Sequence, residues 1–238
     1  MSALRGTVAV VTGATGNVGW GAAHAFAAAG AHVVATVRGA APDLEALLGG
    51  DQHLLVRGDL AVDGDAERVR EAALARFGRV DHVVASIGSW WQKGPVVEQS
   101  PEEFRAVLDS LLTSQFLLAR AMLPWMRRHG GGSYTIVTGA GGEMAIPNAG
   151  LLGAAVMGVF GLSRALRAEH RGADVRVNEL RIRARIERAA RAGVIPSAVA
   201  GEVFTAIARG DADGAVLTYR QPDDARTLPP LRDAPGTA

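Results

Sequence analysis

Short apolar runs alternate along the chain with longer stretches whose apolar residues recur at helical spacing. The short runs are rich in valine and apolar throughout, as in parallel strands that are covered on both faces. These runs predict strands at residues 7–12, 32–37, 53–57, 81–86, 133–138, 174–179 and 215–219. The longer stretches predict helices at residues 17–29, 42–48, 64–76, 101–128, 148–170, 183–192 and 196–208.

Strands that alternate with helices in this order are typical of an α/β fold with a parallel sheet. We therefore expect a doubly wound Rossmann fold, with a seven-stranded parallel sheet flanked by helices. Residues 1–220 are expected to form a single domain, and the proline-rich residues 221–238 a tail that frays at its end. Ser100 is expected to cap the helix at 101–128, and Asn148 the helix that follows.

Composition excludes several classes of function. The formal net charge is +1 and the arginines are scattered, which argues against a nucleic-acid-binding face. The absence of cysteine excludes disulfides, thiolate metal sites and a cysteine nucleophile, and none of the six histidines pairs with an acid at metal-ligand spacing. The chain enters a strand without a signal sequence, and its longest apolar stretch, around 149–162, is shorter than a membrane span of about 20 residues. We therefore expect a cytoplasmic protein without a metal that binds neither nucleic acid nor membrane.

Glycines mark the junction between the first predicted strand and the first predicted helix. Glycine at such a junction permits a tight turn, close approach of the backbone to a pyrophosphate, and close packing of the helix on the strand. The N-terminus of the helix then offers N–H donors and the positive end of its dipole to the phosphates. The loop predicts a dinucleotide site, the alternative being a tight turn that has lost its ligand. The expected contacts are Gly13, Thr15, Gly16, Asn17, Val18 and Gly19.

The residue after the second predicted strand discriminates between cofactors. A cofactor without a 2′-phosphate usually meets Asp or Glu here, which binds the ribose hydroxyls. This chain has Arg38 instead, and a guanidinium group can pair with a 2′-phosphate. The sequence therefore favours NADP(H), unless Arg38 is simply a solvated surface residue.

Several further motifs, in order and spacing over roughly residues 5–220, resemble those of the short-chain dehydrogenase/reductase (SDR) family. They are the glycine loop, Gly58-Asp59-Leu60, Ala85-Ser86-Ile87-Gly88, the long 101–128 helix and Val175-Arg-Val-Asn178. The resemblance implies that Asp59, with Leu60 beside it, contacts the adenine ring. It also implies that Ser86 and Gly88 lie along the cofactor and that the protein forms a homo-oligomer, a dimer or a tetramer.

The departures from the family pattern concern its catalytic residues. By the resemblance, the family's Ser, Tyr and Lys fall at Gly139, Leu152 and Val156, and its Asn falls near Leu111. The side chains at these positions can neither titrate nor form hydrogen bonds, and no Tyr or Lys occurs within residues 139–170. The GxxGxxG spacing of the loop is similar to that of atypical SDR proteins, including NmrA-like ones. We therefore expect an atypical member with a degenerate catalytic tetrad, in which ordinary SDR hydride transfer is lost.

Other side chains are expected at the C-terminal ends of the strands, the usual ligand edge of such a sheet. Trp90 and Trp91 predict a stacking wall for a flat apolar ligand, or else a plug in the core or an interface. Glu143 is either a desolvated acid–base group or an exposed loop acid, and Thr138 either replaces the lost Ser or bonds to backbone at a strand end. The predicted catalytic residues are Glu143 and Thr138. The predicted ligand contacts are Trp90, Trp91, Gln92, Met144 and Leu152.

Two classes of function remain open. One is an enzyme of specialised metabolism that acts on a small hydrophobic or aromatic molecule by a non-standard mechanism. That mechanism is a cyclisation, isomerisation or dehydration, or an NADPH reduction without the Tyr. The other is a non-catalytic NADP-sensing regulator or a pseudoenzyme subunit. A regulator would change its affinity for a protein partner on binding NADP, whereas an enzyme would hold a further small molecule beside the nicotinamide.

Overall fold

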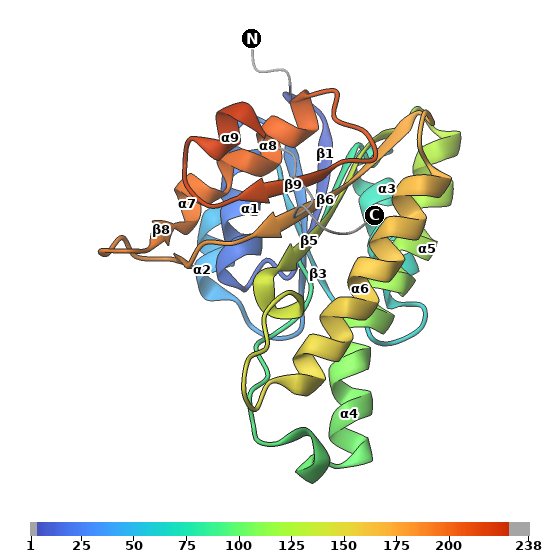
Figure 1. Cartoon of the computed structure of the whole chain (residues 1–238). Helices are drawn as coiled ribbons and strands as arrows, with labels where there is room; N and C mark the ends of the chain where they lie inside the picture. The colour runs from blue at the N-terminus through green and yellow to red at the C-terminus, as the bar shows by residue number, and fades with distance from the viewer. Residues whose placement is uncertain (1–3, 229–238) are drawn as a thin grey trace.

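A seven-stranded parallel sheet forms the centre of the computed structural model, which describes residues 4–228 (Figure 1). Its strand order is β3-β2-β1-β4-β5-β6-β9. The strands are β1 (Val8–Thr12), β2 (His32–Val37), β3 (Leu54–Arg57), β4 (His82–Ala85), β5 (Gly132–Gly139), β6 (Val175–Ile182) and β9 (Val216–Tyr219). Every predicted strand is present, and the doubly wound Rossmann fold is confirmed.

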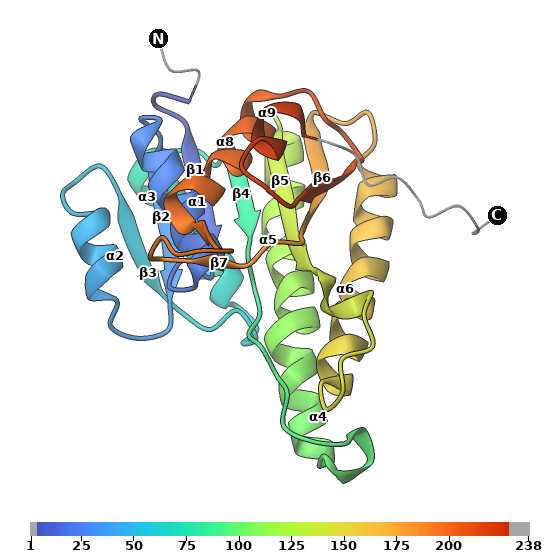
Figure 2. The same ribbon diagram turned by 60° about the vertical axis from the view of Figure 1, so that its left-hand side comes forward.

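Helices cover both faces of the sheet (Figures 1 and 2). One face carries α1 (Asn17–Ala28), α2 (Pro42–Leu47), α7 (Ser197–Ala200), α8 (Glu202–Arg209) and α9 (Asp224–Thr227). The other carries α3 (Asp65–Phe77), α5 (Ser114–Arg128) and α6 (Gly150–Glu169), and α4 (Pro101–Leu108) extends beyond the sheet and packs against α6. Short 3₁₀ turns lie at η1 (Val96–Glu98) and η3 (Ala140–Gly142).

Each face of the sheet has its own buried apolar cluster, which explains why the strands are apolar throughout. In β1, Ala9 and Val11 pack with Phe26 and Phe204 on the α1 and α8 side, whereas Val10 packs on the other. Successive side chains of a strand point to opposite faces, so a strand covered on both sides buries all of them.

The predicted helix 101–128 is one continuous helix with a π-helical turn, η2 (Asp109–Thr113), between α4 and α5. Ser100 caps it as expected: its hydroxyl accepts a hydrogen bond from Glu103 N at 3.1 Å, and the Glu103 carboxylate accepts one from Ser100 N at 2.9 Å. The π turn carries Leu111, and such turns are frequent at functional sites. Helices 101–128 and 150–169 are long and apolar enough to cross a membrane by length and composition, but α5 and α6 pack against the sheet.

Residues 183–192 form no helix, which corrects the prediction for this segment. Ile186–Glu187 (β7) instead pairs with Ile195–Pro196 (β8) in a separate two-stranded sheet. From Arg181 to Ile186, arginine alternates with apolar residues, and this period of two suits an extended backbone rather than a helix.

One boundary also differs from the predictions. Asn148 does not cap α6, because it has a left-handed backbone (φ 64°), and the helix begins after Ala149 without a side-chain cap. The start of the predicted tail is ordered, since Asp224–Thr227 forms α9 and buries Ala225. The rest of the predicted tail, residues 229–238, lies outside the described residues.

Candidate functional site

The glycine loop joins β1 to α1 with very close backbone contacts. Gly13 has φ 60°, and a Cβ at this position would lie 1.8 Å from the carbonyl oxygen of Ser86. A Cβ at Gly19 would lie 2.3 Å from the carbonyl oxygen of Gly13. Helix α1 begins after Gly16 with neither a side-chain cap nor an acidic residue in its first turn. Its N–H donors and positive dipole end therefore suit an anion.

A groove of about 280 Å³ runs from this loop across the C-terminal ends of β1 to β4. We call it the glycine-loop groove. It brings together seven of the predicted cofactor contacts: Gly13, Thr15, Gly16, Arg38, Asp59, Leu60 and Gly88. Of the other four predicted contacts, Asn17 donates to the carbonyl oxygen of Ile186 at 3.0 Å, Gly19 packs on Gly13, and Val18 and Ser86 line a second cavity.

Two charged side chains define the far end of the groove. Arg38 is exposed there, and no carboxylate within residues 4–228 forms an ion pair with it. Asp59 lies in a tight turn, where its backbone N–H donates to Asp65 Oδ2 at 2.7 Å and its own Oδ1 accepts from Ala61 N at 3.1 Å. Among residues 4–228, Arg38 is thus a cation without an ion-pair partner beside the groove.

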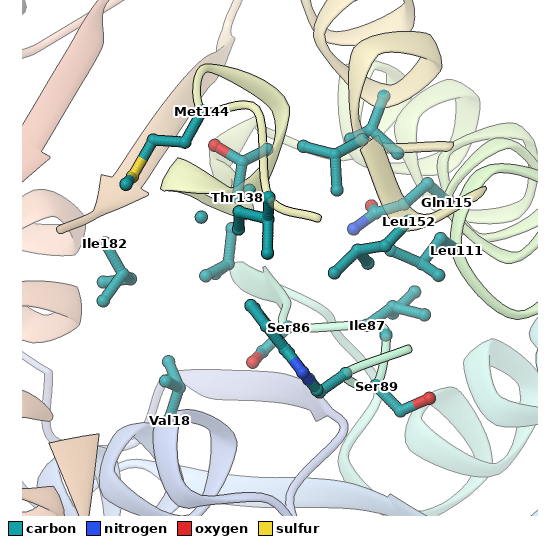
Figure 3. Close-up of a pocket in the computed structure, with 18 of the residues that line it drawn as sticks. Val18, Ser86, Ile87, Ser89, Leu111, Gln115, Thr138, Met144, Leu152 and Ile182 are labelled. Atoms are coloured by element: carbon teal, nitrogen blue, oxygen red, sulfur yellow. The ribbon is translucent and has the colours of Figure 1, made fainter. Parts of the chain in front are cut away.

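The second cavity, of about 750 Å³, opens at the C-terminal ends of β4, β5 and β6 (Figure 3). We call it the apolar cavity. Leu111, Gly139, Leu152 and Val156 line it, so the residues at the family's tetrad positions do lie together. Predicted ligand contacts Trp90, Met144 and Leu152 also line it. Its polar lining consists of Ser86, Ser89, Gln115, Thr138 and Arg185.

The sequence prediction missed Gln115, which is only 2% exposed. Its Nε2 donates to the carbonyl oxygen of Ala85 at 3.1 Å, and its buried Oε1 has no partner within the described chain. The sequence contains a signal for this residue. Leu111, Gln115 and Leu118 are spaced as on one face of a helix, and Gln115 is the polar residue on that buried face.

Thr138 lines the apolar cavity, but its hydroxyl donates to Glu179 Oε1 at 3.1 Å. Glu179 is fully buried and also accepts from Ser163 Oγ at 2.7 Å and from Arg181 Nε at 2.6 Å. An ionised carboxylate can only accept hydrogen bonds, so the Thr138 proton is held by Glu179. Burial lowers the pKa of Arg181, but its bonds to Glu179 and Glu143 outweigh this and raise the pKa above its usual value.

Glu143 does not line either cavity. Its Oε1 pairs with Arg181 Nη1 at 2.5 Å, and its Oε2 pairs with the guanidinium group of Arg183. Both carboxylate oxygens are thus engaged, and an acid–base role would require these ion pairs to open.

Trp91 and Gln92 also lie outside the lining of the apolar cavity. Trp91 packs against the cluster of Val107 and Leu151, with Lys93 Nζ 3.7 Å from its ring centroid. Gln92 donates to the carbonyl oxygen of Pro147 at 2.9 Å. These contacts hold the loop after β4 in place, which corresponds to the packing alternative for Trp91.

Two arginines of the segment after β6 belong to the site and were hidden by the erroneous helix prediction. Arg185 lines the apolar cavity. Arg188 Nη2 donates to the carbonyl oxygen of Thr15 in the glycine loop at 3.0 Å, and its guanidinium carbon lies 4.6 Å from the Trp20 ring centroid. Burial lowers the pKa of Arg188, and the weaker effect of the Asp43 charge opposes this.

The chain is similar to oxidoreductases in sequence and structure. A family model described as enoyl-(acyl carrier protein) reductase matches residues 13–186. A D-threitol dehydrogenase of Mycolicibacterium smegmatis is 34% identical over 181 residues, which cover 74% of this chain and 69% of the relative. A 3-oxoacyl-[acyl-carrier-protein] reductase of Synechocystis is 28% identical over 183 residues, which cover 75% of this chain and 74% of the relative.

A solved structure has the same fold. It is a metagenomic short-chain oxidoreductase in complex with NADP, 26% identical, with a TM-score of 0.79 over 91% of this chain and 98% of that chain. The family model covers most of the chain, and the solved structure has the same overall fold. The chain therefore belongs to the short-chain dehydrogenase/reductase family.

Proposed function

We propose that this protein binds NADP(H) in the glycine-loop groove and a small hydrophobic or aromatic molecule in the apolar cavity. The observation that carries the proposal is the continuity of the two sites. Ile87, Gly88 and Ser89 line both of them. A molecule in the apolar cavity would therefore lie beside a dinucleotide that fills the groove.

The residues of the groove fit NADP(H). The glycine loop and the uncapped start of α1 would hold the pyrophosphate, with Arg188 beside Thr15. The unpaired Arg38 would hold the 2′-phosphate, and the turn at Asp59 would lie against the adenine. A relative with the same fold in complex with NADP supports this choice. When bound, NADP(H) would supply hydride chemistry at the end of the groove that meets the cavity.

The cavity lacks the acid–base groups of ordinary SDR catalysis, and we propose that its tetrad is degenerate. Reduction of a carbonyl needs a proton for the new alkoxide. Arg185 is the one ionisable residue of the described lining, and the Thr138 proton is held by Glu179. The contribution of the cavity is instead to bind and orient a ligand, because Leu111, Leu152 and Val156 exclude water and position the ligand.

The proposed role is therefore that of an enzyme of specialised metabolism with a non-standard mechanism. Its reaction is a cyclisation, an isomerisation or a dehydration, or a reduction that takes its proton from water. The same lack of acid–base groups favours, as a second candidate, a non-catalytic NADP-sensing regulator or a pseudoenzyme subunit.

Calorimetric titration of two ligands tests the proposed sites separately. NADPH and the neutral aromatic probe 4-ethylbenzamide are each titrated into the wild type and into Leu152→Trp, which fills the apolar cavity. We expect NADPH to bind both proteins and the probe to bind only the wild type. The proposal would be contradicted if NADPH failed to bind the wild type, or if the probe bound Leu152→Trp with the same affinity as the wild type.

Reaction class is tested by following the absorbance of the reduced nicotinamide while candidate aromatic substrates are converted. Conversion with loss of that absorbance indicates reduction, and conversion without loss indicates a non-redox reaction. Absence of conversion, with a partner affinity that changes on NADP binding, indicates the regulator.

We also propose that the protein is a cytoplasmic homo-oligomer. Phe104, Phe116 and Met157 are exposed apolar side chains of α4, α5 and α6. Light scattering coupled to size-exclusion chromatography should give a dimer or a tetramer. Phe116→Glu should shift the protein towards monomer. A wild type with the mass of a monomer would refute the proposed homo-oligomer.

A further inference from the structure

The apolar cavity contains one charged side chain within its described lining, Arg185. Its side chain is 68% exposed, so the charge lies at the mouth rather than in the interior. The interior is formed by aliphatic side chains such as Leu111, Leu152 and Val156, each less than 10% exposed. The cavity is thus apolar within and cationic at its mouth.

The charge of Arg185 is only partly neutralised. Its Nε donates to Glu187 Oε1 at 2.7 Å, but the same oxygen also accepts from Arg191. Two guanidinium groups therefore share one carboxylate and leave a net positive charge. The terminal Nη atoms of Arg185 form no hydrogen bond within the described residues.

The neighbouring arginines differ from Arg185 in this respect. Arg181 bonds to Glu179 and Glu143, and Arg183 pairs with Glu143. Neither lines the cavity. Along the segment after β6, Arg185 is thus the arginine that both borders the cavity and keeps its planar pair of Nη donors unbonded. Such a pair matches the two oxygens of a carboxylate.

We propose that the ligand of the apolar cavity is an amphiphilic carboxylic acid. Its ring or chain packs among Leu111, Leu152 and Val156, and its carboxylate accepts hydrogen bonds from Arg185 Nη1 and Nη2. This inference rests on the proposed function, namely that the cavity holds a small molecule, and it adds the chemical class of that molecule.

A matched pair of probes tests the inference. 4-Ethylbenzoate and 4-ethylbenzamide have the same shape, and only the first carries a charge. Each is titrated calorimetrically into the wild type, Arg185→Gln and Arg191→Gln, with and without saturating NADP⁺. Arg191→Gln is the matched control, because Arg191 pairs with the same carboxylate and does not line the cavity.

We expect the wild type to bind the benzoate about 10-fold more tightly than the benzamide, the effect of one charge-assisted contact. Arg185→Gln should bring the two affinities within about 2-fold. Arg191→Gln should keep a smaller preference for the benzoate, because both Nη donors of Arg185 remain while Glu187 is no longer shared. Both arginines are exposed, so both variants should have the same melting temperature as the wild type. The preference of the wild type for the benzoate over the benzamide tests the inference without any variant.

Equal binding of the two probes by the wild type would overturn the inference while leaving the proposed function intact. So would a benzoate preference that survives Arg185→Gln. NADPH is also titrated into Arg185→Gln. A loss of NADPH affinity with an unchanged benzoate preference would assign Arg185 to the cofactor and would overturn the inference. Binding of neither probe would contradict the proposed function itself, and the inference would fall with it.

Discussion

Replacing Glu179 with Gln should destabilise the protein strongly, because Glu179 is the buried centre of a polar network. The substitution preserves volume and removes the negative charge. Arg181 Nε, 2.6 Å from Glu179 Oε1, and Arg167 Nη2, 3.9 Å from Oε2, would then lose their buried counter-charge. Ser163 and Thr138 would lose a charged acceptor.

Breaking a buried ion pair by removing one partner costs about 3–5 kcal/mol. Arg181 keeps its pairing with Glu143, so the low end, about 3 kcal/mol, is expected for Glu179→Gln. For a chain of this size, the melting temperature should fall by about 6–12 °C. The urea midpoint should fall by roughly 1 M, taking a slope of about 2–3 kcal/mol per M.

Glu187→Gln provides the control, because Glu187 also pairs with two arginines but on the surface. Its melting temperature should stay close to that of the wild type. The reasoning would be refuted if Glu179→Gln lost less than about 1 kcal/mol or behaved like Glu187→Gln.

Further predictions concern a buried histidine, the tryptophans after β4 and the glycines. Burial lowers the pKa of His82 from 6.5 to about 4, against the weaker opposing charge of Asp81. Unfolded His82 therefore takes up a proton below pH 6.5 while the folded residue stays neutral, so the free energy of unfolding of the wild type should fall by about 3 kcal/mol between pH 6.5 and pH 4. Urea unfolding of His82→Gln should show a free energy of unfolding that depends less on pH. Trp90→Ala should weaken binding of 4-ethylbenzamide with little change in melting temperature, whereas Trp91→Ala should lower the melting temperature with little change in binding; the reverse pattern would contradict the cavity lining. Gly13→Ala should abolish NADPH binding or folding because of the clash with the Ser86 carbonyl, whereas Gly161→Ala, with open space in α6, should gain about 0.5–1 kcal/mol in urea unfolding.

The strands, the main helices and the glycine loop could be predicted because each depends on local pattern. A parallel strand buried on both faces must be apolar throughout, and the junction of β1 and α1 leaves no room for a Cβ at Gly13 or Gly19. The helix predicted at 183–192 is wrong because arginine alternates there with apolar residues, and this period of two favours an extended strand. The left-handed backbone of Asn148 depends on the loop before α6, which local pattern does not specify.

The apolar cavity was predictable only in part. The family resemblance brought Leu111, Leu152 and Val156 together correctly, because they occupy positions with fixed spacing. Pairings across the fold could not be anticipated: Glu143 turns towards Arg181 and Arg183, which lie about 40 positions further along the chain. Gln115, Arg185 and Arg188 acquire their environment from tertiary contacts that single elements do not reveal.

The most direct test of the account is a calorimetric comparison of NADPH and NADH on the wild type and on Arg38→Ala. We predict that the wild type binds NADPH more tightly than NADH. Loss of the Arg38 guanidinium should weaken NADPH binding by about 10-fold and leave NADH binding unchanged, as expected for a contact with the 2′-phosphate alone. Binding of neither dinucleotide to the wild type, or an NADPH preference that survives in Arg38→Ala, would contradict the assignment of the glycine-loop groove.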